Sequence, residues 1–528
     1  MKSLMKRVFA AAAAIATVFG LAATTVATAN AADNATLTVS TTDAKFAGKT
    51  VNAYKMFSAT VSGDGKAVSY TLTDEWKPFF KNSVGLTGVT DENVNDKAND
   101  YVSKLKDSTL VAFATKASNW AQTKANNITA DATATVSADA SNGKYTATFT
   151  GLGYGYYVVA VPGATLANAK SQYATLVSVH STKVDADIKG DLPTVDKKVQ
   201  VDGTGKDATD AKIGDTLTFT LTSTIPDMSA YDTYTFNFKD MLSKGLTFGQ
   251  VKSVKVENVT LTENTDYTVT TPTASNNNTL TVAMKDFKTK QQANAGKKIT
   301  VTYTATLNEN AVVGGAGNVN SAKIQYSNNP STNGTGESEP SKVRVFTYGF
   351  TVDKYTGDQY TDAATRLAGA EFTLAHKDGS AISFVQVSAG SATANAVYRV
   401  AKAGETGTTT ITTPANGKVV FEGLENGEYT LTETKAPAGY NKLASAIGVK
   451  VDGQNNGTDT TNATVTITYN NDNGNDYNQT ASNGVIPVQN KSGAILPGTG
   501  GMGTIAFTVI GVLVIALGVA WTLKRKNA

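Results

Sequence analysis

Short runs that alternate between apolar and polar residues recur along the middle of the chain. Residues 145–150 (YTATFT) and 216–221 (TLTFTL) are two examples. Turn-like pieces rich in glycine, asparagine and aspartate separate such runs, at 62–65, 274–278 and 377–379. Because side chains alternate between the two faces of a strand, such short runs separated by turns predict β-sandwiches. The expected fold class is therefore all-β, with tandem immunoglobulin-like sandwich domains.

One segment, from about residue 92 to 126, departs from the alternation. Its apolar residues recur at helical spacing and form a stripe of Tyr101, Val102, Leu105, Leu110, Phe113, Ala114 and Trp120. This spacing predicts a helical excursion from the first sandwich, with the stripe packed into a core rather than against a ligand.

A tetrapeptide that occurs twice suggests where the sandwiches begin. Thr-Val-Asp-Lys occurs at 194–197 and again at 351–354. The N-terminal and C-terminal apolar segments, which are described below, leave about 465 residues between them, enough for roughly three domains. We therefore expect an N-terminal domain over 32–190, a middle domain over 191–346 and a third domain over 347–492.

The middle and third domains each place polar side chains on the apolar face of a strand. Lys197, for example, has the parity of Val195 and Val199. The same alternation turns six residues inward: Lys197, Asp240 and Asn320 in the middle domain, and Lys354, Glu433 and Asn490 in the third. Asn318 shares the parity of Asn320 and is the alternative asparagine.

Buried lysine, acid and asparagine side chains together suggest a particular chemistry. Charged residues are almost never fully buried unless they are paired. Burial lowers the pKa of a lysine and raises that of a carboxylic acid. A neutral lysine amine is a nucleophile, and a protonated acid can polarise an amide and move protons. Each set can therefore form a Lys–Asn isopeptide bond with loss of ammonia, although ordinary salt bridges at strand ends explain the pattern equally well.

The N-terminus has the organisation of a secretory signal peptide. Lys2, Lys6 and Arg7 precede an apolar run that ends near residue 26, and small residues follow at 27–31. We expect cleavage after Ala31, with Ala29 as the second choice. A buried N-terminal helix is the less favoured interpretation.

The C-terminal segment, from residue 493 to the end, predicts a membrane-spanning helix. Residues 505–523 carry no charge and approach the length needed to cross a bilayer. A basic cluster follows at 524–526, and such clusters stay in the cytoplasm. The bulk of the chain is therefore expected outside the membrane, tethered at its C-terminus.

Composition narrows the chemistry further. The 47 basic and 44 acidic residues nearly balance, so nothing points to nucleic acid as a partner. The chain has no cysteine, although disulfides can form outside the cell. Any covalent reinforcement must come from another reaction.

The pentapeptide Leu496-Pro497-Gly498-Thr499-Gly500 precedes the apolar run and its basic tail. This order resembles the LPxTG-type sorting signal of sortase substrates in Gram-positive bacteria. The resemblance implies that a sortase cleaves between Thr499 and Gly500 and passes the acyl group to an amine. It implies sortase and cell-wall peptidoglycan as partners, and a protein secreted and then anchored covalently to the wall.

Two further stretches resemble the domains of sortase-assembled major pilins. Residues 427–440 (GEYTLTETKAPAGY), with 367–374 (LAGAEFTL), are similar to a Cna-B-type domain and its E-box. The resemblance assigns the catalytic acid to Glu433, with Lys354 and Asn490 as the bonded pair. The stretches 193–199 and 238–242 resemble the middle pilin domain, where Asp240 takes the acid's role. Residues 151–159 resemble a strand of N-terminal pilin domains, for which we predict no such bond.

A shaft subunit also needs an exposed lysine to accept the Thr499 acyl group. The usual Tyr-Pro-Lys-Asn-like pilin motif is absent. Lys189 is the nearest equivalent, because it falls on the opposite face from Val184, Ala186 and Ile188. Lys183 and Lys198 are the alternatives, and Lys189 is otherwise an ordinary surface lysine.

Three classes of function compete. We favour a structural pilus subunit that polymerises with identical subunits, together with tip or minor pilins and host surface ligands as candidate partners. A monomeric wall-anchored adhesin has the same chain ends but would not use an internal lysine. A wall-anchored enzyme finds little support, because His180 and His376 stand in separate domains without a motif. We expect no cofactor and no metal, and interpret Asn471 to Gly474 as a turn rather than a calcium site.

Overall fold

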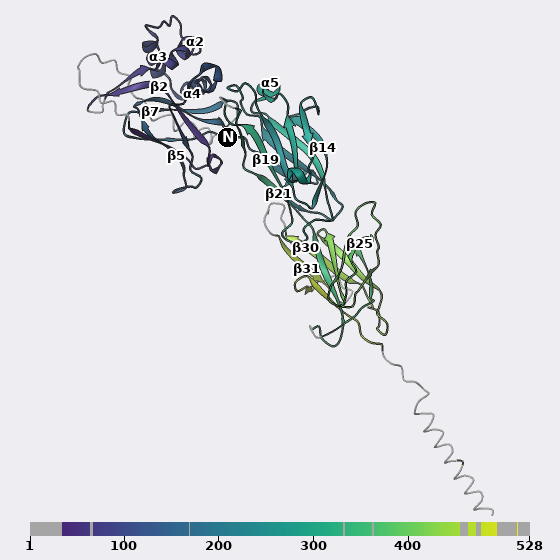
Figure 1. Ribbon diagram of the computed structural model, residues 1–528. Coiled ribbons are helices and arrows are strands. Elements are labelled where there is room, and N and C mark those ends of the chain that lie inside the picture. Colours follow the sequence, from purple (N-terminus) through teal and green to yellow (C-terminus); the bar gives the residue numbers. More distant parts are fainter. Residues whose placement is uncertain are drawn as a thin grey trace, which may run out of the picture.

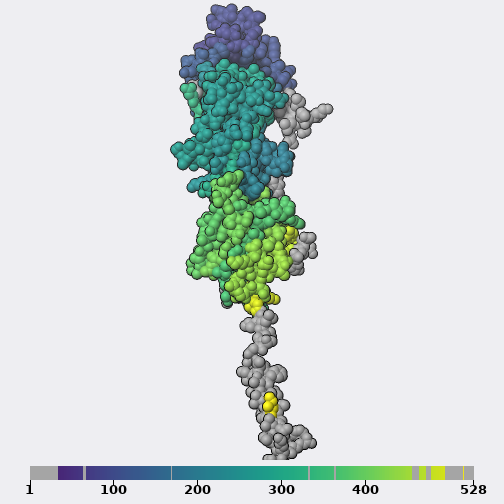
Figure 2. Space-filling model, turned by 90° about the vertical axis from the view of Figure 1, so that its right-hand side faces the viewer, coloured from purple at the N-terminus to yellow at the C-terminus, as the bar shows by residue number. Residues whose placement is uncertain are grey.

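The computed structural model of the protein describes residues 34–63, 67–167, 169–330, 333–361, 364–454, 463–470, 477–493 and Ile515. Three pairs of β-sheets follow one another in chain order along an elongated molecule (Figure 1). The space-filling view shows the same succession, from the purple N-terminal sheets to the green C-terminal ones (Figure 2). The predicted all-β architecture of tandem domains is confirmed.

The first pair of sheets combines strands from residues 35–187. One sheet has the order β5-β1-β8, and the other has the order β3-β2-β6-β7 with β4 paired to β2. The strands are β1 Ala35–Thr41, β2 Thr50–Val61, β3 Val68–Leu72, β4 Ala132–Thr135, β5 Tyr145–Leu152, β6 Gly155–Thr165, β7 Gln172–Val179 and β8 Lys183–Asp187.

Helices cover one face of this first pair, and two of the three lie in the segment 92–126 that the sequence predicts to be helical. The helices are α2 Lys77–Asn82, α3 Val94–Ser103 and α4 Asp107–Gln122. The predicted single segment is broken at Lys106, whose backbone is extended and whose amide donates to Thr109 Oγ1 at 2.9 Å. This break lets both halves of the stripe pack on the same core, where Val102, Phe113 and Ala114 are buried.

The second pair of sheets comprises residues 196–346. Its six-stranded sheet has the order β10-β9-β12-β18-β14-β15, and the other has the order β11-β21-β19-β13-β17-β16 with β20 beside β19. The elements are β9 Asp196–Val201, β10 Thr204–Lys206, β11 Ala208–Asp210, β12 Thr216–Thr224, β13 Phe236–Leu242, β14 Leu246–Val256, β15 Val259–Thr260, β16 Tyr267–Thr270, β17 Thr279–Met284, α5 Phe287–Gln291, β18 Lys298–Leu307, β19 Asn318–Ser327, β20 Thr335–Glu337 and β21 Ser341–Phe346.

The third pair of sheets comprises residues 348–489. Its sheets have the orders β23-β22-β28-β26-β25, with β33 beside β22, and β27-β24-β29-β30-β31-β32. The strands are β22 Tyr348–Thr356, β23 Thr365–Arg366, β24 Glu371–His376, β25 Phe384–Ser388, β26 Ala396–Val400, β27 Ile411–Thr412, β28 Lys418–Leu424, β29 Gly427–Lys435, β30 Ile447–Gln454, β31 Thr464–Tyr469, β32 Gln479–Thr480 and β33 Val485–Gln489.

Successive pairs of sheets are joined by backbone hydrogen bonds. Thr165 and Asp191 exchange two such bonds, of 2.8 and 2.7 Å, at the junction of the first and second pairs. At the next junction the amide of Ile213 donates to the carbonyl of Gly423 at 3.0 Å. The side chain of Ile213 packs into the core of the third pair.

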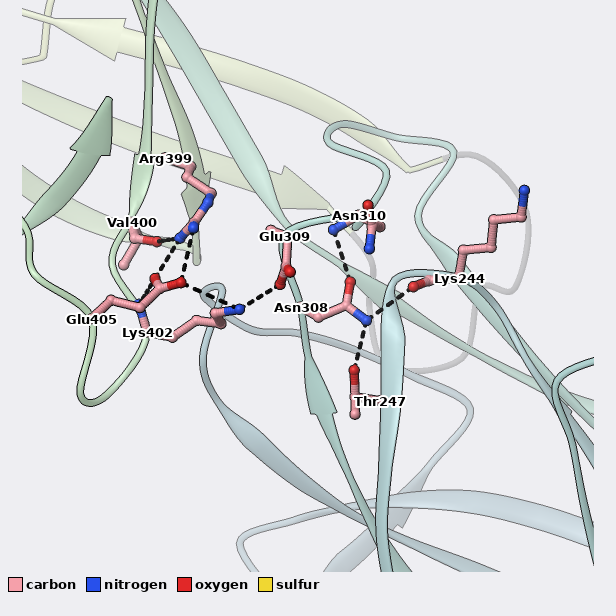
Figure 3. A network of polar contacts seen from close by, with 9 residues as sticks. All are labelled: Lys244, Thr247, Asn308, Glu309, Asn310, Arg399, Val400, Lys402 and Glu405. Carbon is pink, nitrogen blue, oxygen red and sulfur yellow. Dashed lines mark hydrogen bonds and ion pairs between the residues drawn. The ribbon is translucent and has the colours of Figure 1, made fainter. Parts of the chain in front are cut away.

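Ionic contacts lie beside this second junction (Figure 3). Lys402 Nζ donates to Glu309 Oε2 at 2.5 Å, between the third and second pairs of sheets. On the third-pair side, Arg399 holds Glu405 through two bonds of 2.7 and 2.9 Å. On the other side, Asn308 Nδ2 donates to the carbonyl of Lys244 at 2.9 Å and to Thr247 Oγ1 at 2.8 Å. The junction is thus fixed by backbone, apolar and charged groups together.

Several predictions fall outside the described residues. These are the signal peptide at 1–31, the turn at 471–474, the pentapeptide at 496–500, the apolar run at 505–523 apart from Ile515, and the basic cluster at 524–526. Among the residues that the structure describes, no helix has the length and apolar character to cross a bilayer. The domain boundaries near 190 and 346 stay predictions; the sheets change between β8 and β9 and between β21 and β22.

Candidate functional site

The second pair of sheets brings Lys197, Asp240 and Asn320 together in its core, where each is 0% exposed. Asp240 and Asn320 lie on the neighbouring strands β13 and β19, because Asp240 pairs with Ala322 and Leu242 pairs with Asn320. Lys197 comes from β9 in the facing sheet. The alternation of β9, β13 and β19 turns all three side chains into the space between the sheets.

A fourth residue, Tyr303 of β18, connects these three side chains. Lys197 Nζ donates to Asp240 Oδ2 and, at 2.9 Å, to the Tyr303 hydroxyl. Tyr303 donates to Asp240 Oδ2 at 2.6 Å, and Asn320 Nδ2 donates to the Tyr303 oxygen at 2.7 Å. The Tyr303 ring stacks on Phe219 with centroids 5.3 Å apart. The hydroxyl therefore touches the amine, the acid and the amide at once.

Burial controls the electrostatics of this cluster. Removal from water lowers the pKa of Lys197 to about 8, although the nearby Asp240 carboxylate acts in the opposite direction. The pKa of Tyr303 is raised well above its usual value by burial and by Asp240. Within the described part of the chain, Asp240 Oδ1 and Asn320 Oδ1 have no hydrogen-bond partner. The amide oxygen is thus left without a donor beside a lysine of depressed pKa.

The third pair of sheets contains a second buried cluster of Lys354, Glu433 and Asn490. Lys354 belongs to β22. Its Nζ lies 3.4 Å from Glu433 Oε1 and donates to the carbonyl of Val488 at 3.2 Å. Asn490 Nδ2 donates to Glu433 Oε2 at 3.0 Å and to the carbonyl of Asn441 at 2.8 Å. Here the acid contacts the amide directly.

The strand arrangement of this second cluster differs from the first. β22 pairs in parallel with β33, so that Lys354 is opposite Val488, and Asn490 comes two residues later, directly after the end of β33. Glu433 enters from β29 in the facing sheet. Burial is the main cause that lowers the pKa of Lys354 to about 8, and Glu433 opposes it. The lysine and asparagine thus share a sheet here, whereas in the first cluster the acid and asparagine do.

The alternative asparagine, Asn318, is engaged elsewhere. Its side chain accepts from the amide of Val312 at 2.9 Å and donates to the carbonyls of Val312 and Val345, each at 3.2 Å. Asn318 is therefore a buried residue that satisfies the backbone of a loop, and Asn320 is the asparagine beside Lys197.

The three candidate linking lysines differ in their surroundings. Lys189 is exposed just after the buried Ile188, and Lys183 is exposed at the start of β8. Lys198 is half-buried and paired with Asp207 at 2.6 Å and Asp196 at 3.4 Å. An ion-paired amine is a poorer nucleophile than a free one, which favours Lys189 and Lys183 over Lys198.

Two features of these sites escape sequence reasoning. Tyr303 lies at an inward position of β18 between the buried Val301 and Ala305, but an inward tyrosine is usually an ordinary core residue. Asp353 lies on the outer face of β22 and is still buried. Arg366 Nε lies 2.6 Å from its Oδ1, and Tyr360 donates to its Oδ2 at 2.8 Å. That cover comes from Tyr360 in a loop and from Arg366 of the short strand β23, and strand alternation along β22 cannot predict it.

Two stretches of the chain match protein-family models. Residues 213–330 match the Cna-B-like domain of Gram-positive pilin backbone subunit 2. Residues 358–466 match the SpaA prealbumin-like fold domain. The chain therefore contains a Gram-positive pilin backbone Cna-B-like domain followed by a SpaA-type prealbumin-like domain.

A curated relative matches a longer stretch of the chain. The trypsin-resistant surface T6 protein of Streptococcus pyogenes serotype M6 is 26% identical over 279 residues, which are 48% of this chain and 44% of the relative. The chain thus spans less than half the length of this curated relative.

Solved pilin structures show a looser likeness. The T6 backbone pilin of S. pyogenes is 18% identical, with 88% of this chain and 99% of that chain covered and a TM-score of 0.47. The major pilin subunit BcpA of Bacillus cereus is 18% identical, with 87% of this chain and 99% of that chain covered and a TM-score of 0.39. The major pilin SpaD of Corynebacterium diphtheriae is 21% identical, with 79% of this chain and 90% of that chain covered and a TM-score of 0.39.

Proposed function

We propose that this chain is the major structural subunit of a covalently polymerised cell-surface pilus, and not an enzyme. The observation that carries the proposal is the pair of buried Lys–acid–Asn clusters, whose Asp240, Asn320 and Glu433 lie within the stretches that match pilin families. The serial arrangement of the sheets along one axis supports it, because an elongated subunit suits a thin fibre (Figure 2). The domains of the subunit would be 32–190, 191–346 and 347–492.

In each cluster we infer an intramolecular isopeptide bond. The neutral amine of Lys197 attacks Cγ of Asn320, the C–N bond to Nδ2 breaks, and that nitrogen leaves as ammonia. Asp240 takes a proton from the amine nitrogen and gives one up toward the leaving nitrogen, so that the acid is regenerated. Glu433 serves Lys354 and Asn490 in the same way. The lowered pKa values of both lysines support this chemistry, because they increase the share of neutral amine near neutral pH.

The chain ends complete the proposed assembly. Signal peptidase would remove 1–31, and the run at 505–523 would hold the secreted subunit in the membrane. A sortase would then cleave after Thr499 and transfer its acyl group to Lys189 of an identical subunit or to peptidoglycan. Tip or minor pilins and host surface ligands are further candidate partners. The exposure of Lys189 supports its role as the acceptor.

The linking lysine can be tested on cells. Lys189→Ala should abolish the ladder of SDS-resistant, high-mass species on immunoblots of wall extracts, because no amine would remain at the acceptor position. The monomer should still be exported and wall-linked through Thr499. Thr499→Ala should lose both the ladder and the wall linkage.

Lys183→Ala is the matched control, because it removes a neighbouring exposed lysine. A full ladder in Lys189→Ala cells would reject Lys189, and Lys183 and Lys198 would be tested next, alone and combined. Parent cells that form no ladder under any growth condition would reject polymerisation and favour a monomeric wall-anchored adhesin.

A further inference from the structure

The two buried clusters differ in how the acid contacts the asparagine. In the third pair of sheets, Glu433 Oε2 accepts directly from Asn490 Nδ2 at 3.0 Å. In the second pair, Asn320 Nδ2 donates instead to the hydroxyl of Tyr303, at 2.7 Å. Within the described residues, the other Asp240 oxygen, Oδ1, has no hydrogen-bond partner. The hydroxyl therefore stands between the acid and the nitrogen that must leave.

The shorter side chain of aspartate explains this arrangement. Asp240 and Asn320 lie on adjacent strands but are offset along them, since Asp240 pairs with Ala322. Aspartate has one methylene less than glutamate. Tyr303 spans the gap from the facing sheet, and its ring is held by stacking on Phe219 at an interplanar angle of 18°.

We propose that Tyr303 is a catalytic residue of the middle-domain isopeptide bond, and that its hydroxyl relays a proton from Asp240 to the departing nitrogen of Asn320. The inference rests on the proposed Lys197–Asn320 bond. A hydroxyl can both donate and accept, and its hydrogen can rotate between partners. At 2.6 Å from Asp240 Oδ2 and 2.7 Å from Asn320 Nδ2, the oxygen is within proton-transfer distance of both.

The relay leaves the catalytic groups unchanged. Lys197 nitrogen adds to Cγ of Asn320. Tyr303 gives its hydroxyl proton to Nδ2 and takes the carboxyl proton of Asp240. Asp240 then takes a proton from the Lys197 nitrogen, which is hydrogen-bonded to it in the structure. The Cγ–Nδ2 bond breaks, ammonia leaves, and both Tyr303 and Asp240 regain their protons.

The rate of bond formation in the full-length chain tests the relay. Cells that lack sortase are pulsed with heavy-isotope lysine and chased, and the branched peptides of both clusters are quantified by mass spectrometry after digestion. Tyr303→Phe should slow the Lys197–Asn320 bond on the order of 100-fold, the usual scale of acid–base catalysis. The Lys354–Asn490 bond of the same molecules should form at the parental rate and so reports on folding.

Two further variants separate a relay from a packing role. Tyr326→Phe removes the hydroxyl of another buried tyrosine, on the strand that carries Asn320, and should change neither rate. Tyr303→Phe combined with Asp240→Glu should restore the bond, because the longer acid can reach Asn320 as Glu433 reaches Asn490. A purely structural defect would not be rescued in this way.

The possible outcomes distinguish failure of the Tyr303 relay from failure of the proposed Lys197–Asn320 bond. A parent chain without the Lys197–Asn320 peptide would refute the proposed bond itself. A parent that forms the bond, with Tyr303→Phe forming it equally fast, would refute the relay alone. Slow formation in Tyr303→Phe without rescue by Asp240→Glu would also refute it.

Discussion

At the scale of single residues, the inward lysines, acids and asparagines are the features that strand alternation predicts well. A side chain flanked two positions away by core residues must share their face, and Lys197, Asp240 and Glu433 are all buried as this rule requires. Asn320 and Asn318 have equal parity, and only their hydrogen-bond partners separate them. Strand alternation does not reveal the role of Tyr303, because its sequence context is that of any core tyrosine.

The mass of the ectodomain should report both proposed bonds. The secreted, unpolymerised chain should weigh less than its sequence by two ammonia molecules. Glu433→Ala should restore one ammonia and leave the other loss intact, and Asp240→Ala should do the converse, because the two clusters lie in different cores. Intact-mass spectrometry checks this, and a parent mass equal to the plain sequence would exclude both bonds.

The pKa of Lys197 predicts how a variant without the bond responds to pH. In Asn320→Ala the amine stays free, and its folded-state pKa of about 8 lies below the unfolded value of 10.5. The unfolded chain then binds more protons between these values. The destabilisation is therefore fully present below about pH 8 and is relieved as the pH rises toward 10.5.

The expected gain over that window is about 3 kcal/mol at most. Urea unfolding of Asn320→Ala at several pH values measures it, and Asn320→Ala combined with Lys197→Met is the control for all other titrating groups. Equal pH dependence in the two variants would contradict a depressed Lys197 pKa.

At the scale of elements, the Lys354–Asn490 bond would fasten the last strand of the third pair of sheets. β33 pairs only with β22 in the described sheet, and Asn490 follows its end. The sequence predicts this fastening from parity and resemblance, but not that β22 and β33 are parallel neighbours. Strand order depends on contacts between residues far apart in the chain, which local patterns do not encode. The break between α3 and α4 likewise depends on how both helices pack.

Loss of this bond should destabilise the third domain. A cross-link reduces the freedom of the unfolded chain, and closing a loop of about 100 residues contributes roughly 4.7 kcal/mol by the chain-entropy relation for disulfides. The loop between Lys354 and Asn490 is of that order. Glu433→Ala should therefore lower the melting temperature and speed tryptic digestion.

Calorimetry checks this expectation, with Glu428→Ala as the control. Glu428 is an acid on the same strand whose ion pair with Lys377 lies at the surface. Equal melting of Glu433→Ala and the parent would count against a structural role for the bond.

At the scale of the whole molecule, the junction between the second and third pairs of sheets sets the shape. Lys402 and Glu309 are 28% and 44% exposed, so their ion pair is worth little. Ile213, by contrast, is buried against Gly423, whose φ is +85°. A Cβ on Gly423 would lie 2.7 Å from Ile213 Cδ1. Close packing at this glycine therefore holds the junction more firmly than the ion pair does.

Gly423→Val should loosen the junction and lengthen or broaden the molecule. The added side chain would clash with Ile213 and strain a backbone conformation that favours glycine. Small-angle X-ray scattering of residues 32–493 should show a wider distance distribution, whereas Glu309→Ala should match the parent. Identical scattering from Gly423→Val and the parent would show that the junction does not depend on this contact.

The positions of the two clusters determine which parts of a fibre would feel tension. In a shaft joined through Lys189 and Thr499, a pull enters shortly before Lys197 and leaves shortly after Asn490. The two isopeptide bonds would carry it past residues 198–319 and 355–489, so that neither stretch is part of the stressed path. Only the short segments outside the bonds, and the β19 to β22 region that connects them, would be stretched. Such a fibre would extend little under force and would recover its length without refolding its sandwiches.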